Sequence, residues 1–455
     1  MPKVVVVGGG FAGVSAAACA RNAGSEVTLV ERTDELLGLG RYSGMFYNDG
    51  RMSAVEELIA LGGGFIFDIL MKPPVMTYER NEMNWTALED LAHREALDIS
   101  IFNCMLAEPA IRKYLSGLGV NLIFEDRAVD AAASSKDGKE RKLTSVTLES
   151  GKRLEADSFV DCSGGAGGIQ VCIDHGYGCV ECNLRCNSFG DRVSIATKAG
   201  AKELRKLRTA DRGGGFGAIS SACSFYETSI DPTLVARLKK NGTAKIEVPE
   251  EVREMLKVGL ATNWPYDPSQ VKFLKLSYPG FFKANGMVYM PLKDVRRIPG
   301  FEKARFSDPL GGGKGNAVRY ISMAPRENTM KVFGFGNLFV GGEKSGPVVG
   351  IQECIVTGGI AGYNAAREAQ GRELLTPPRT TVIGEFFAYV QKMMETDQGL
   401  MQTYSFMKPS FRKIMASKGW WAKTVPEAIE ESRRRIAEAK LTGVMSTSMP
   451  VPITK

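Results

Sequence analysis

The sequence is poor in several features, and each shortage excludes a class of protein. No apolar run approaches the roughly 18 residues that a membrane-spanning helix needs, so we expect no membrane partner. Nine cysteines are too few for a disulfide scaffold in a chain of this length. No G-x-S-x-G segment occurs, so the nucleophile elbow of the serine hydrolases is absent from the sequence. The first residues do not read as a signal peptide, and we expect a cytoplasmic protein.

The sequence is long, rich in glycine and mildly basic. A chain of 455 residues is longer than one compact core usually holds, which predicts two domains or a large insertion. The 51 glycines suit tight turns and places where the backbone approaches a ligand closely. The net charge of +7 permits an anionic partner, such as a dinucleotide or a nucleic acid, without requiring one.

A glycine motif follows the first predicted strand. The apolar residues 4–7 lead into G-x-G-x-x-G at Gly8, Gly10 and Gly13, and an alanine-rich helix is expected at about 14–22. Gly8 should make the turn, Gly10 should let the backbone touch a pyrophosphate, and Gly13 should let the helix pack closely on the sheet. The helix N-terminus offers N–H groups and a positive dipole end to the phosphates. This order of elements predicts a dinucleotide site.

A second predicted strand, at 26–30, ends on an acidic residue. Glu31 stands where a carboxylate accepts the two ribose hydroxyls of an adenosine, and we include the adjacent Arg32 in the predicted site. A carboxylate at this position repels the additional phosphate of NADP. The N-terminal motif therefore favours NAD or FAD.

Two segments far along the chain decide between these cofactors. Residues 337–343 form a short apolar strand that ends in Gly342 and Glu343, and a helix is predicted from about Gly350, with Ile351 in its first turn. This pattern resembles the flavoproteins with the glutathione-reductase-like fold. The resemblance implies an acid near the ribityl chain and pyrophosphate. It also implies a helix N-terminus at the pyrimidine edge of the flavin, where negative charge develops on reduction.

A third segment, 158–165, is similar to the strand and glycine turn that passes the same cofactor in the middle of such chains, with Gly164 in the turn. Together the three segments predict FAD and a glutathione-reductase-like (Rossmann) α/β fold. We expect a discontinuous FAD-binding domain at 1–170 and 320–375. An inserted mixed α+β substrate domain is expected at 171–319, and a helical C-terminal region with a loose tail at 376–455.

Four cysteines lie close together inside the predicted insertion. Cys172, Cys179, Cys182 and Cys186 have the spacing C-x6-C-x2-C-x3-C. Thiolates this close suit an iron–sulfur cluster, a structural zinc or a redox-active pair, and reduced structural thiols are the plain alternative. The spacing matches no ferredoxin pattern, so we assign no metal ligands. Cys179, Cys182 and Cys186 are our candidate catalytic residues.

Two basic segments bear on a nucleic-acid partner. Basic residues between Lys198 and Arg208 recur with helical spacing, and Arg433–Arg435 lie on a predicted helix at 426–440. Solvated helix faces and phosphate contacts both fit these segments. No aromatic residues interleave the first one, so base stacking is not indicated.

Several segments resemble one group of flavoproteins. These are the folate- and FAD-dependent tRNA uracil-5-methyltransferases and the related flavoproteins that modify the wobble uridine of tRNA. The segments that carry the resemblance are the glycine motif and the 337–367 region already described, together with 298–304, 318–329 and 371–384. The resemblance covers about half of the chain and implies FAD as cofactor and tRNA as a partner.

The chain also departs from the methyltransferase pattern. The methyltransferases carry a cysteine in the loop after the first ribose-binding acid, whereas residues 38–44 contain none. The surroundings of the clustered cysteines do not match their nucleophilic cysteine either. We therefore expect an FAD-dependent oxidoreductase that performs two-electron chemistry on a small-molecule substrate at flavin N5. The alternatives are a tRNA uracil-5-methyltransferase-like enzyme and a flavin electron-transfer subunit that serves a redox protein partner.

Overall fold

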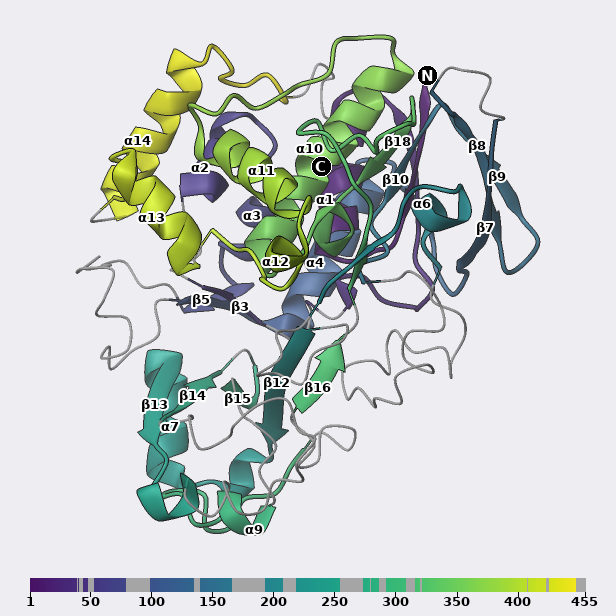
Figure 1. Cartoon of the computed structure of the whole chain (residues 1–455). Coiled ribbons are helices and arrows are strands. Elements are labelled where there is room, and N and C mark those ends of the chain that lie inside the picture. Colours follow the sequence, from purple (N-terminus) through teal and green to yellow (C-terminus); the bar gives the residue numbers. More distant parts are fainter. Residues whose placement is uncertain are drawn as a thin grey trace.

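The computed structural model builds the chain around a five-stranded parallel sheet with the strand order β18-β10-β1-β2-β6 (Figure 1). These strands are β1 (Lys3–Val7), β2 (Glu26–Val30), β6 (Asn121–Ile123), β10 (Ser158–Asp161) and β18 (Leu338–Val340). This order confirms the predicted α/β class. The residues that the structure describes are 1–38, 40, 44–47, 53–78, 99–134, 140–165, 193–207, 218–253, 273–278, 280–285, 292–307, 316–319, 321–406, 408–422 and 425–446.

The central strand is buried on both faces, which explains its unbroken run of valines. Val4 and Val6 belong to the core that includes the helices α1 (Phe11–Asn22) and α10 (Ile351–Ala369). Val5 and Val7 belong to a separate core on the other face. That face is covered by an antiparallel sheet made of β7 (Ala128–Ala133), β8 (Leu143–Leu148) and β9 (Arg153–Glu155).

Between β2 and β6 the chain forms a helical layer and a small antiparallel sheet. The sheet has the order β3-β5-β4. Its strands and the neighbouring helices are β3 (Met45–Tyr47), α2 (Ser53–Ala60), α3 (Phe65–Leu70), β4 (Met76–Tyr78), β5 (Ile99–Phe102) and α4 (Cys104–Gly117). Phe102 meets Phe11 of α1 edge to face, with the ring centroids 6.0 Å apart. This contact ties the small sheet to the start of α1.

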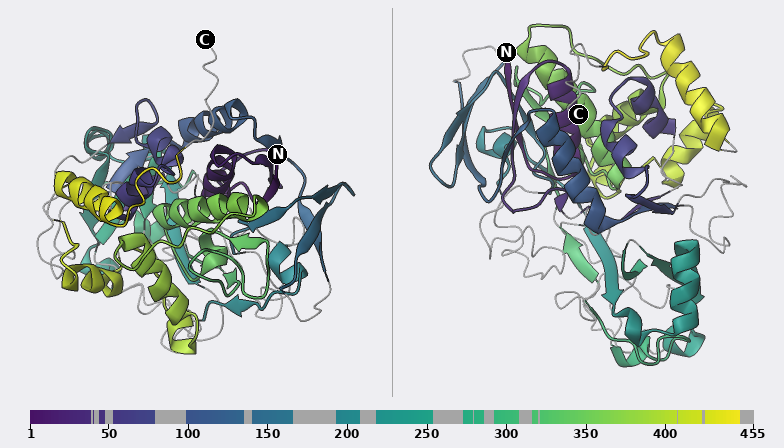
Figure 2. Two further views of the ribbon diagram at one scale, coloured as in Figure 1. Left: turned by 90° about the horizontal axis from the view of Figure 1, so that it is seen from above. Right: turned by 180° about the vertical axis from the view of Figure 1, so that it is seen from behind.

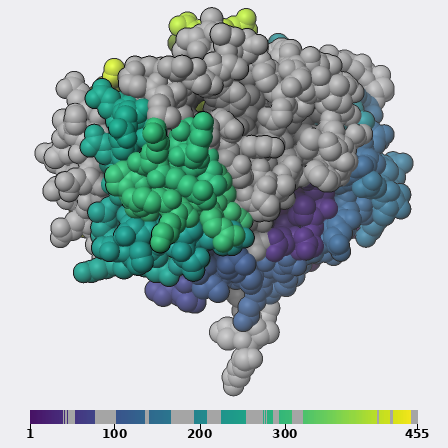
Figure 3. Space-filling model, turned by 90° about the horizontal axis from the view of Figure 1, so that it is seen from below, coloured from purple at the N-terminus to yellow at the C-terminus, as the bar shows by residue number. Residues whose placement is uncertain are grey.

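The chain leaves the parallel sheet after β10 and returns to it with β18. The intervening residues form a second five-stranded sheet, order β13-β14-β15-β12-β16, in a separate lobe (Figures 1 and 2). From below, this lobe forms part of the near face beside N-terminal residues (Figure 3). Its strands and those of a two-stranded sheet are β11 (Leu204–Arg205), β12 (Ala218–Phe225), β13 (Thr243–Glu247), β14 (Phe273–Ser277), β15 (Phe282–Asn285), β16 (Asn316–Arg319) and β17 (Ser322–Met323).

This lobe has a core of its own, built around aromatic rings. Phe225 meets Phe282 and Phe301 edge to face, at centroid distances of 6.2 and 5.5 Å. The described helical elements between β10 and β16 in the sequence are α6 (Ile195–Lys198), η6 (Glu227–Ser229), α7 (Pro232–Asn241) and α9 (Leu292–Val295). A mixed α+β insertion was predicted here, and the residue boundaries 171 and 319 stay predictions.

The C-terminal region is helical, as predicted, and packs against α2 and α10. Its helices are α11 (Val382–Met393), α12 (Asp397–Leu400), α13 (Pro409–Ser417) and α14 (Val425–Glu438). The prediction of a loose tail from residue 443 is wrong for its first part. Met445 is buried, and its N–H donates to the Leu61 carbonyl at 2.7 Å, because the end of α2 leaves space that an apolar side chain fills. Residues 447–455 lie outside the described part of the chain.

Candidate functional site: the carboxyl edge of the parallel sheet

Three turns meet where β1, β10 and β18 end in register. The Cys162 N–H donates to the Val7 carbonyl at 2.8 Å, and the Gly341 N–H donates to the Asp161 carbonyl at 3.1 Å. Ligands of open α/β sheets bind at this edge. The structure therefore brings together turns that lie far apart in the sequence, and these turns contain the predicted residues Gly8, Gly10, Gly13, Gly164, Gly342 and Glu343.

The three glycines of the first motif have different surroundings. A Cβ on Gly8 would lie 2.5 Å from the Cys162 carbonyl oxygen, and a Cβ on Gly13 would lie 1.8 Å from the Gly8 carbonyl oxygen. A Cβ on Gly10 would meet no atom of the described residues within 4 Å. Gly8 and Gly13 are therefore required by the packing of the protein itself. Gly10 leaves space at the N-terminus of α1, which fits a pyrophosphate held by backbone N–H groups.

Glu31 supports this turn from the end of β2. One carboxylate oxygen accepts the Gly9 N–H at 2.7 Å, and the other accepts the N–H and the hydroxyl of Thr33, both at 3.0 Å. The side chain is 8% exposed, and Arg32 beside it is half-buried. A carboxylate has about four acceptor positions, so these bonds leave capacity for a ribose hydroxyl. The ribose-binding role of Glu31 and the cofactor role of Arg32 stay predictions.

The second helix at this edge is α10, and it packs directly on α1. A Cβ on Gly358 would lie 2.1 Å from the Ala12 carbonyl oxygen, and a Cβ on Gly362 would lie 2.0 Å from the Ala16 carbonyl oxygen. Equal steps along both helices mean that they run in the same direction. At 1.5 Å per residue, the start of α10 at Ile351 extends about 9 Å beyond the start of α1. The N-terminus of α10 therefore extends beyond that of α1 at the same end of the helix pair.

The turn before α10 contains the predicted acid. Gly342 has φ +64° and donates its N–H to the Thr357 hydroxyl at 2.8 Å, which fixes the short helix η8 (Gly342–Ser345) against α10. Glu343 lies in η8 and is 8% exposed. Gly350 is the N-cap residue of α10, with φ +130° and no side-chain capping bond. The predicted helix start is confirmed, and the cofactor roles of Glu343, Gly350 and Ile351 stay predictions.

Asp161, which the sequence reading did not select, organises the middle turn. One carboxylate oxygen accepts the N–H and the hydroxyl of Ser163, at 3.0 and 2.5 Å. The other accepts the Ser194 hydroxyl at 2.7 Å and the Ala196 N–H at 3.0 Å, at the start of α6. The only sequence signal was an acid between an apolar strand and a glycine turn. Asp161 fixes the backbone that leads to Gly164.

Glu353 was also missed, and it lies in the first turn of α10. The side chain is fully buried. Its Oε1 accepts the Phe406 N–H at 2.8 Å, while its Oε2 has no hydrogen-bond partner among the described residues. Burial raises the pKa of Glu353 to about 7, although the N–H groups of Phe406 and of Glu353 itself and the Ser405 hydroxyl oppose the shift. A single acid in an apolar stretch of helix gave no sequence signal for this environment.

The clustered cysteines lie outside the described residues, because the structure does not describe 166–192. The roles predicted for Cys179, Cys182 and Cys186, with or without an iron–sulfur cluster, stay predictions. Within the described ranges, no group of three or more His, Cys, Asp or Glu side chains is arranged to hold a metal ion. Burial raises the pKa of Cys162, at the end of β10, well above its ordinary value, so this thiol stays protonated at neutral pH.

The basic segments are not the continuous solvated faces that their spacing suggested. The first forms the short helix α6 and the strand β11, and Lys206 is buried with its ammonium donating to the Met401 carbonyl at 2.6 Å. Pairing of β11 with β17 overrode the helical pattern. On α14, Arg434 is exposed and pairs with acids of its own helix, whereas Arg435 is buried against Glu57 at 2.7 Å.

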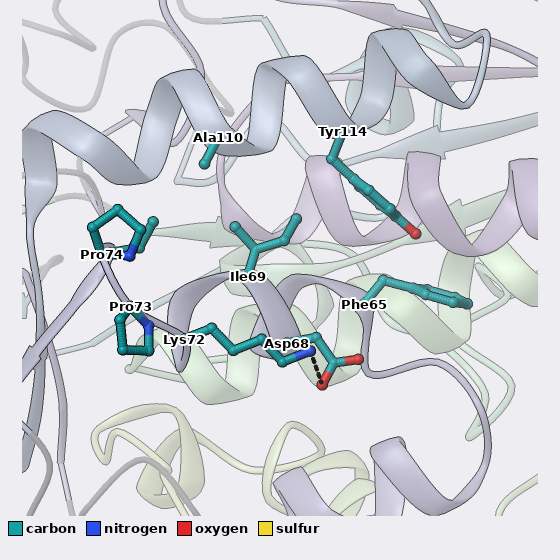
Figure 4. Close-up of a pocket in the computed structure, with 9 residues that line it drawn as sticks. Phe65, Asp68, Ile69, Lys72, Pro73, Pro74, Ala110 and Tyr114 are labelled. Carbon is teal, nitrogen blue, oxygen red and sulfur yellow. Dashed lines mark ion pairs between the residues drawn. The ribbon is translucent and has the colours of Figure 1, made fainter. Parts of the chain in front are cut away.

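An open pocket of about 420 Å³ lies between α3 and α4, away from this edge (Figure 4). The Phe65 and Tyr114 rings stack at its wall with centroids 6.3 Å apart, and Lys72 pairs with Asp68 at 3.9 Å on its rim. Tyr114 lies beside Asn22, the last residue of α1. The pocket is therefore at the opposite end of α1 from Gly10, and none of the predicted site residues lines it.

Comparisons with known proteins agree with this geometry. The model of a family described as FAD dependent oxidoreductase matches residues 3–168, and that of a family described as Glucose inhibited division protein A matches residues 278–373. These two regions of the chain are similar to the two families. The first match covers β1, α1, β2 and β10, and the second covers β18 and α10. FAD is therefore the cofactor that fits the three turns, and residues 3–168 are similar to the FAD dependent oxidoreductase family.

Similar proteins support the same relationship. The methylenetetrahydrofolate–tRNA-(uracil-5-)-methyltransferase TrmFO of Natranaerobius thermophilus is 33% identical over 132 residues, which are 27% of this chain and 28% of that protein. The TrmFO of Syntrophomonas wolfei is 37% identical over 117 residues, which are 25% and 26% of the two chains. The match spans about a quarter of the length of these relatives.

A solved structure confirms the predicted fold over nearly the whole chain. GidA of Aquifex aeolicus superimposes with a TM-score of 0.63 at 16% identity, covering 96% of this chain and 77% of that one. The predicted Rossmann-like FAD-binding fold is thereby confirmed. In the parts that the structure describes, no helix has both the length and the apolar character that a bilayer crossing needs.

Proposed function

We propose that the chain is an FAD-dependent oxidoreductase with its cofactor on the carboxyl edge of the parallel sheet. One observation carries the proposal. The space that a side chain would take at Gly8 and Gly13 is occupied by backbone atoms, whereas the corresponding space at Gly10, at the N-terminus of α1, is open among the described residues. Close backbone packing at two glycines, with free space at the third, is the arrangement that lets a ligand phosphate approach the backbone. The converging turns with Gly164, Gly342 and Glu343 support a cofactor that extends across all three strands.

The residues of this edge have separable tasks in the proposed function. Bound FAD would supply two-electron chemistry at its N5 atom. The N–H groups at the start of α1 hold the pyrophosphate, and Glu31 holds the ribose while it supports the Gly9 backbone. The turn from Gly342 to Gly350 holds the remaining half of the cofactor. We propose that the substrate reaches the flavin between this edge and the lobe of β12–β16, and that a nicotinamide or a redox protein supplies electrons.

The visible absorption spectrum of protein purified without oxygen tests the proposal. Two flavin bands at a one-to-one ratio of FAD to chain are the expected result. Protein that is colourless and stays so after incubation with FAD contradicts the proposal. A broad additional shoulder that is lost in a variant with Cys179, Cys182 and Cys186 replaced by serine would assign an iron–sulfur cluster to those cysteines.

A second candidate function is methyl transfer to uracil of tRNA with a folate donor, and the 33% identity to the TrmFO relative favours it. It would give the chain tRNA as a partner and place it in the cytoplasm. The assay is methylation of unmodified tRNA with methylenetetrahydrofolate and a reduced nicotinamide, which supplies the two electrons that convert the methylene carbon to a methyl group. It compares the wild type with single Cys→Ser variants at 179, 182 and 186. Methylation lost in one of these variants supports the candidate. No methylation by FAD-loaded protein contradicts it and leaves the oxidoreductase proposal standing.

A further inference from the structure

Glu353 and the C-terminal region together close the turn that leads into α10. The segment at Tyr404 runs beside this turn: the Val349 N–H donates to the Tyr404 carbonyl and the Tyr404 N–H donates to the Pro347 carbonyl, both at 2.9 Å. Two residues further on, the Phe406 N–H donates to Glu353 Oε1 at 2.8 Å. The carboxyl group therefore joins the first turn of α10 to a segment that follows it by about fifty residues.

The second carboxyl oxygen is directed at the helix start. A Cβ on Gly350 would lie 1.9 Å from Glu353 Oε2, so this oxygen is packed against the N-cap backbone of α10. It is completely buried and has no hydrogen-bond partner among the described residues. An ionised carboxylate in this position is costly, because burial removes its solvation. It also occupies the positive end of the helix dipole that an electron-rich ligand edge would otherwise use.

Among the described residues, the charged groups of the neighbouring elements bond to other partners or are acids themselves. On η8, the Lys344 ammonium donates to the Ser322 carbonyl at 2.9 Å, and Glu343 is an acid itself. Before β18, Arg326 donates to the carbonyls of Ser345 and Phe387 at 3.0 and 3.2 Å.

Other groups near Glu353 are neutral or acidic side chains. The Tyr404 hydroxyl donates to the Gly399 carbonyl at 2.9 Å, the Ser405 hydroxyl hydrogen bonds to Glu353, and Cys354 follows on α10. On α2, which packs against α10, Glu56 is another buried acid. Burial is the largest cause that raises the pKa of Glu353, and among the described residues only hydrogen bonds oppose it.

We propose that Glu353 is a positioning residue that links flavin binding to a proton: the protein binds FAD more tightly when this carboxyl group is protonated. The neutral form leaves the positive end of α10 to the pyrimidine edge of the flavin and keeps the Phe406 bond that holds the turn. The ionised form places a buried negative charge at the same helix end. The inference rests on the proposed function, because it requires a flavin at the N-terminus of α10.

The test is the dissociation constant of FAD between pH 6 and pH 8.5, measured by the fluorescence of FAD released on dilution of the holoprotein. If the flavin favours the protonated form tenfold, the wild-type dissociation constant rises about tenfold across this range. Glu353→Gln keeps the shape but cannot ionise, so its constant should stay near the wild-type value at low pH. Glu385→Gln is the matched control, because Glu385 is also buried but is paired with Arg379 and Lys418.

The outcomes separate the two proposals. The inference is supported if the dissociation constant of FAD rises with pH in the wild type and in Glu385→Gln but does not change with pH in Glu353→Gln. A wild-type profile that is flat, or a Glu353→Gln profile as steep as that of the wild type, overturns it while FAD binding stands. Protein that binds no FAD at any pH overturns the proposed function and the inference together. If Glu353→Gln does not fold, the wild-type profile still decides, since a flat profile contradicts the link.

Discussion

The N-termini of α1 and α10 lie at the same sheet edge and run in the same direction, but their first turns differ. The first turn of α1 contains no acid, and Gly10 before it faces open space. The first turn of α10 contains the buried Glu353, packed against Gly350. The N-terminus of α1 thus has no acidic side chain in its first turn and has space for a ligand, whereas the N-terminus of α10 has the titratable side chain of Glu353. The difference suggests that anion binding at the N-terminus of α1 does not depend on protonation of the protein, whereas anion binding at the N-terminus of α10 depends on the charge of Glu353.

A third helix end shows what a compensated glutamate looks like. Glu57 of α2 is as deeply buried as Glu353, but it accepts the N–H groups of Val382 and Ile383 at the start of α11, each at 2.9 Å. It also pairs with the buried Arg435 at 2.7 Å. Burial raises the pKa of Glu57, and Arg435 and the two N–H groups oppose that shift. In the part of the chain that the structure describes, no such cation is paired with Glu353.

The largest effect is expected from Arg435→Met, which converts the α11 arrangement into one resembling that at α10. Removing one partner of a buried ion pair leaves an uncompensated charge and costs about 3–5 kcal/mol of unfolding free energy. Urea unfolding at pH 8 measures the loss. Arg434→Met is the control, because Arg434 is half exposed and its ion pairs are screened by solvent, so we expect a much smaller loss there. Equal losses in the two variants would show that the buried pair is no more important than its exposed neighbour.

The next effect is the pH dependence of stability that Glu353 contributes. Its pKa is raised from 4.5 to about 7 by burial, so the folded state binds more protons than the unfolded state between these values. Stability therefore falls as the pH rises through this window, by about 3 kcal/mol for a shift of this size. Glu353→Gln should remove that decline. Urea unfolding at pH 5 and pH 8.5 checks it, and parallel declines in the variant and the wild type would contradict it.

The contrast between the two helix ends could be predicted only in part from the sequence. The motif with Gly8, Gly10 and Gly13 was predictable because a strand, a glycine turn and a helix follow one another within a short stretch, although Gly8 also packs against the distant Cys162. Glu353 and Asp161 were not, because their partners at Phe406 and Ser194 come from other elements. Nor did three adjacent arginines show that Arg435 alone turns inward. Long-range packing decides each of these environments, and local pattern does not record it.

Errors in the predicted elements have the same origin. Basic residues between 198 and 207 recur with helical spacing, but strand pairing with Ser322–Met323 divides the segment. Met445 lies in a stretch of polar and small residues that reads as a tail, yet the space beside Leu61 buries it. Strands β1, β10 and β18 were predictable because each is a short apolar run followed by a glycine turn, whereas β6 was not predicted. The elements that cover the sheet pack against residues that are distant in the sequence, so local patterns do not predict how they pack.

A smaller effect is expected where the two helices touch. Gly358→Ala places a Cβ 2.1 Å from the Ala12 carbonyl oxygen, so α10 must move away from α1. Overpacking of this kind costs about 1–3 kcal/mol. It should also lower FAD affinity, because the two helix ends no longer keep their stagger. Thermal unfolding with and without added FAD measures both. Gly371→Ala, which meets no described atom within 4 Å, controls for the loss of a glycine, although its φ of +66° adds local strain.

The smallest change in stability, with a selective loss of binding, is expected for Gly10→Ala. Gly10 has φ −65° and its Cβ would meet no described atom within 4 Å, so alanine fits the folded protein without strain. If the open space belongs to the pyrophosphate, the added methyl group weakens FAD binding by about tenfold or more, equivalent to about 1.4 kcal/mol, while the apoprotein keeps its melting temperature. Gly117→Ala, at the end of α4, also meets open space and should leave FAD affinity unchanged. Unchanged FAD affinity in Gly10→Ala would mean that the α1 end does not hold the cofactor.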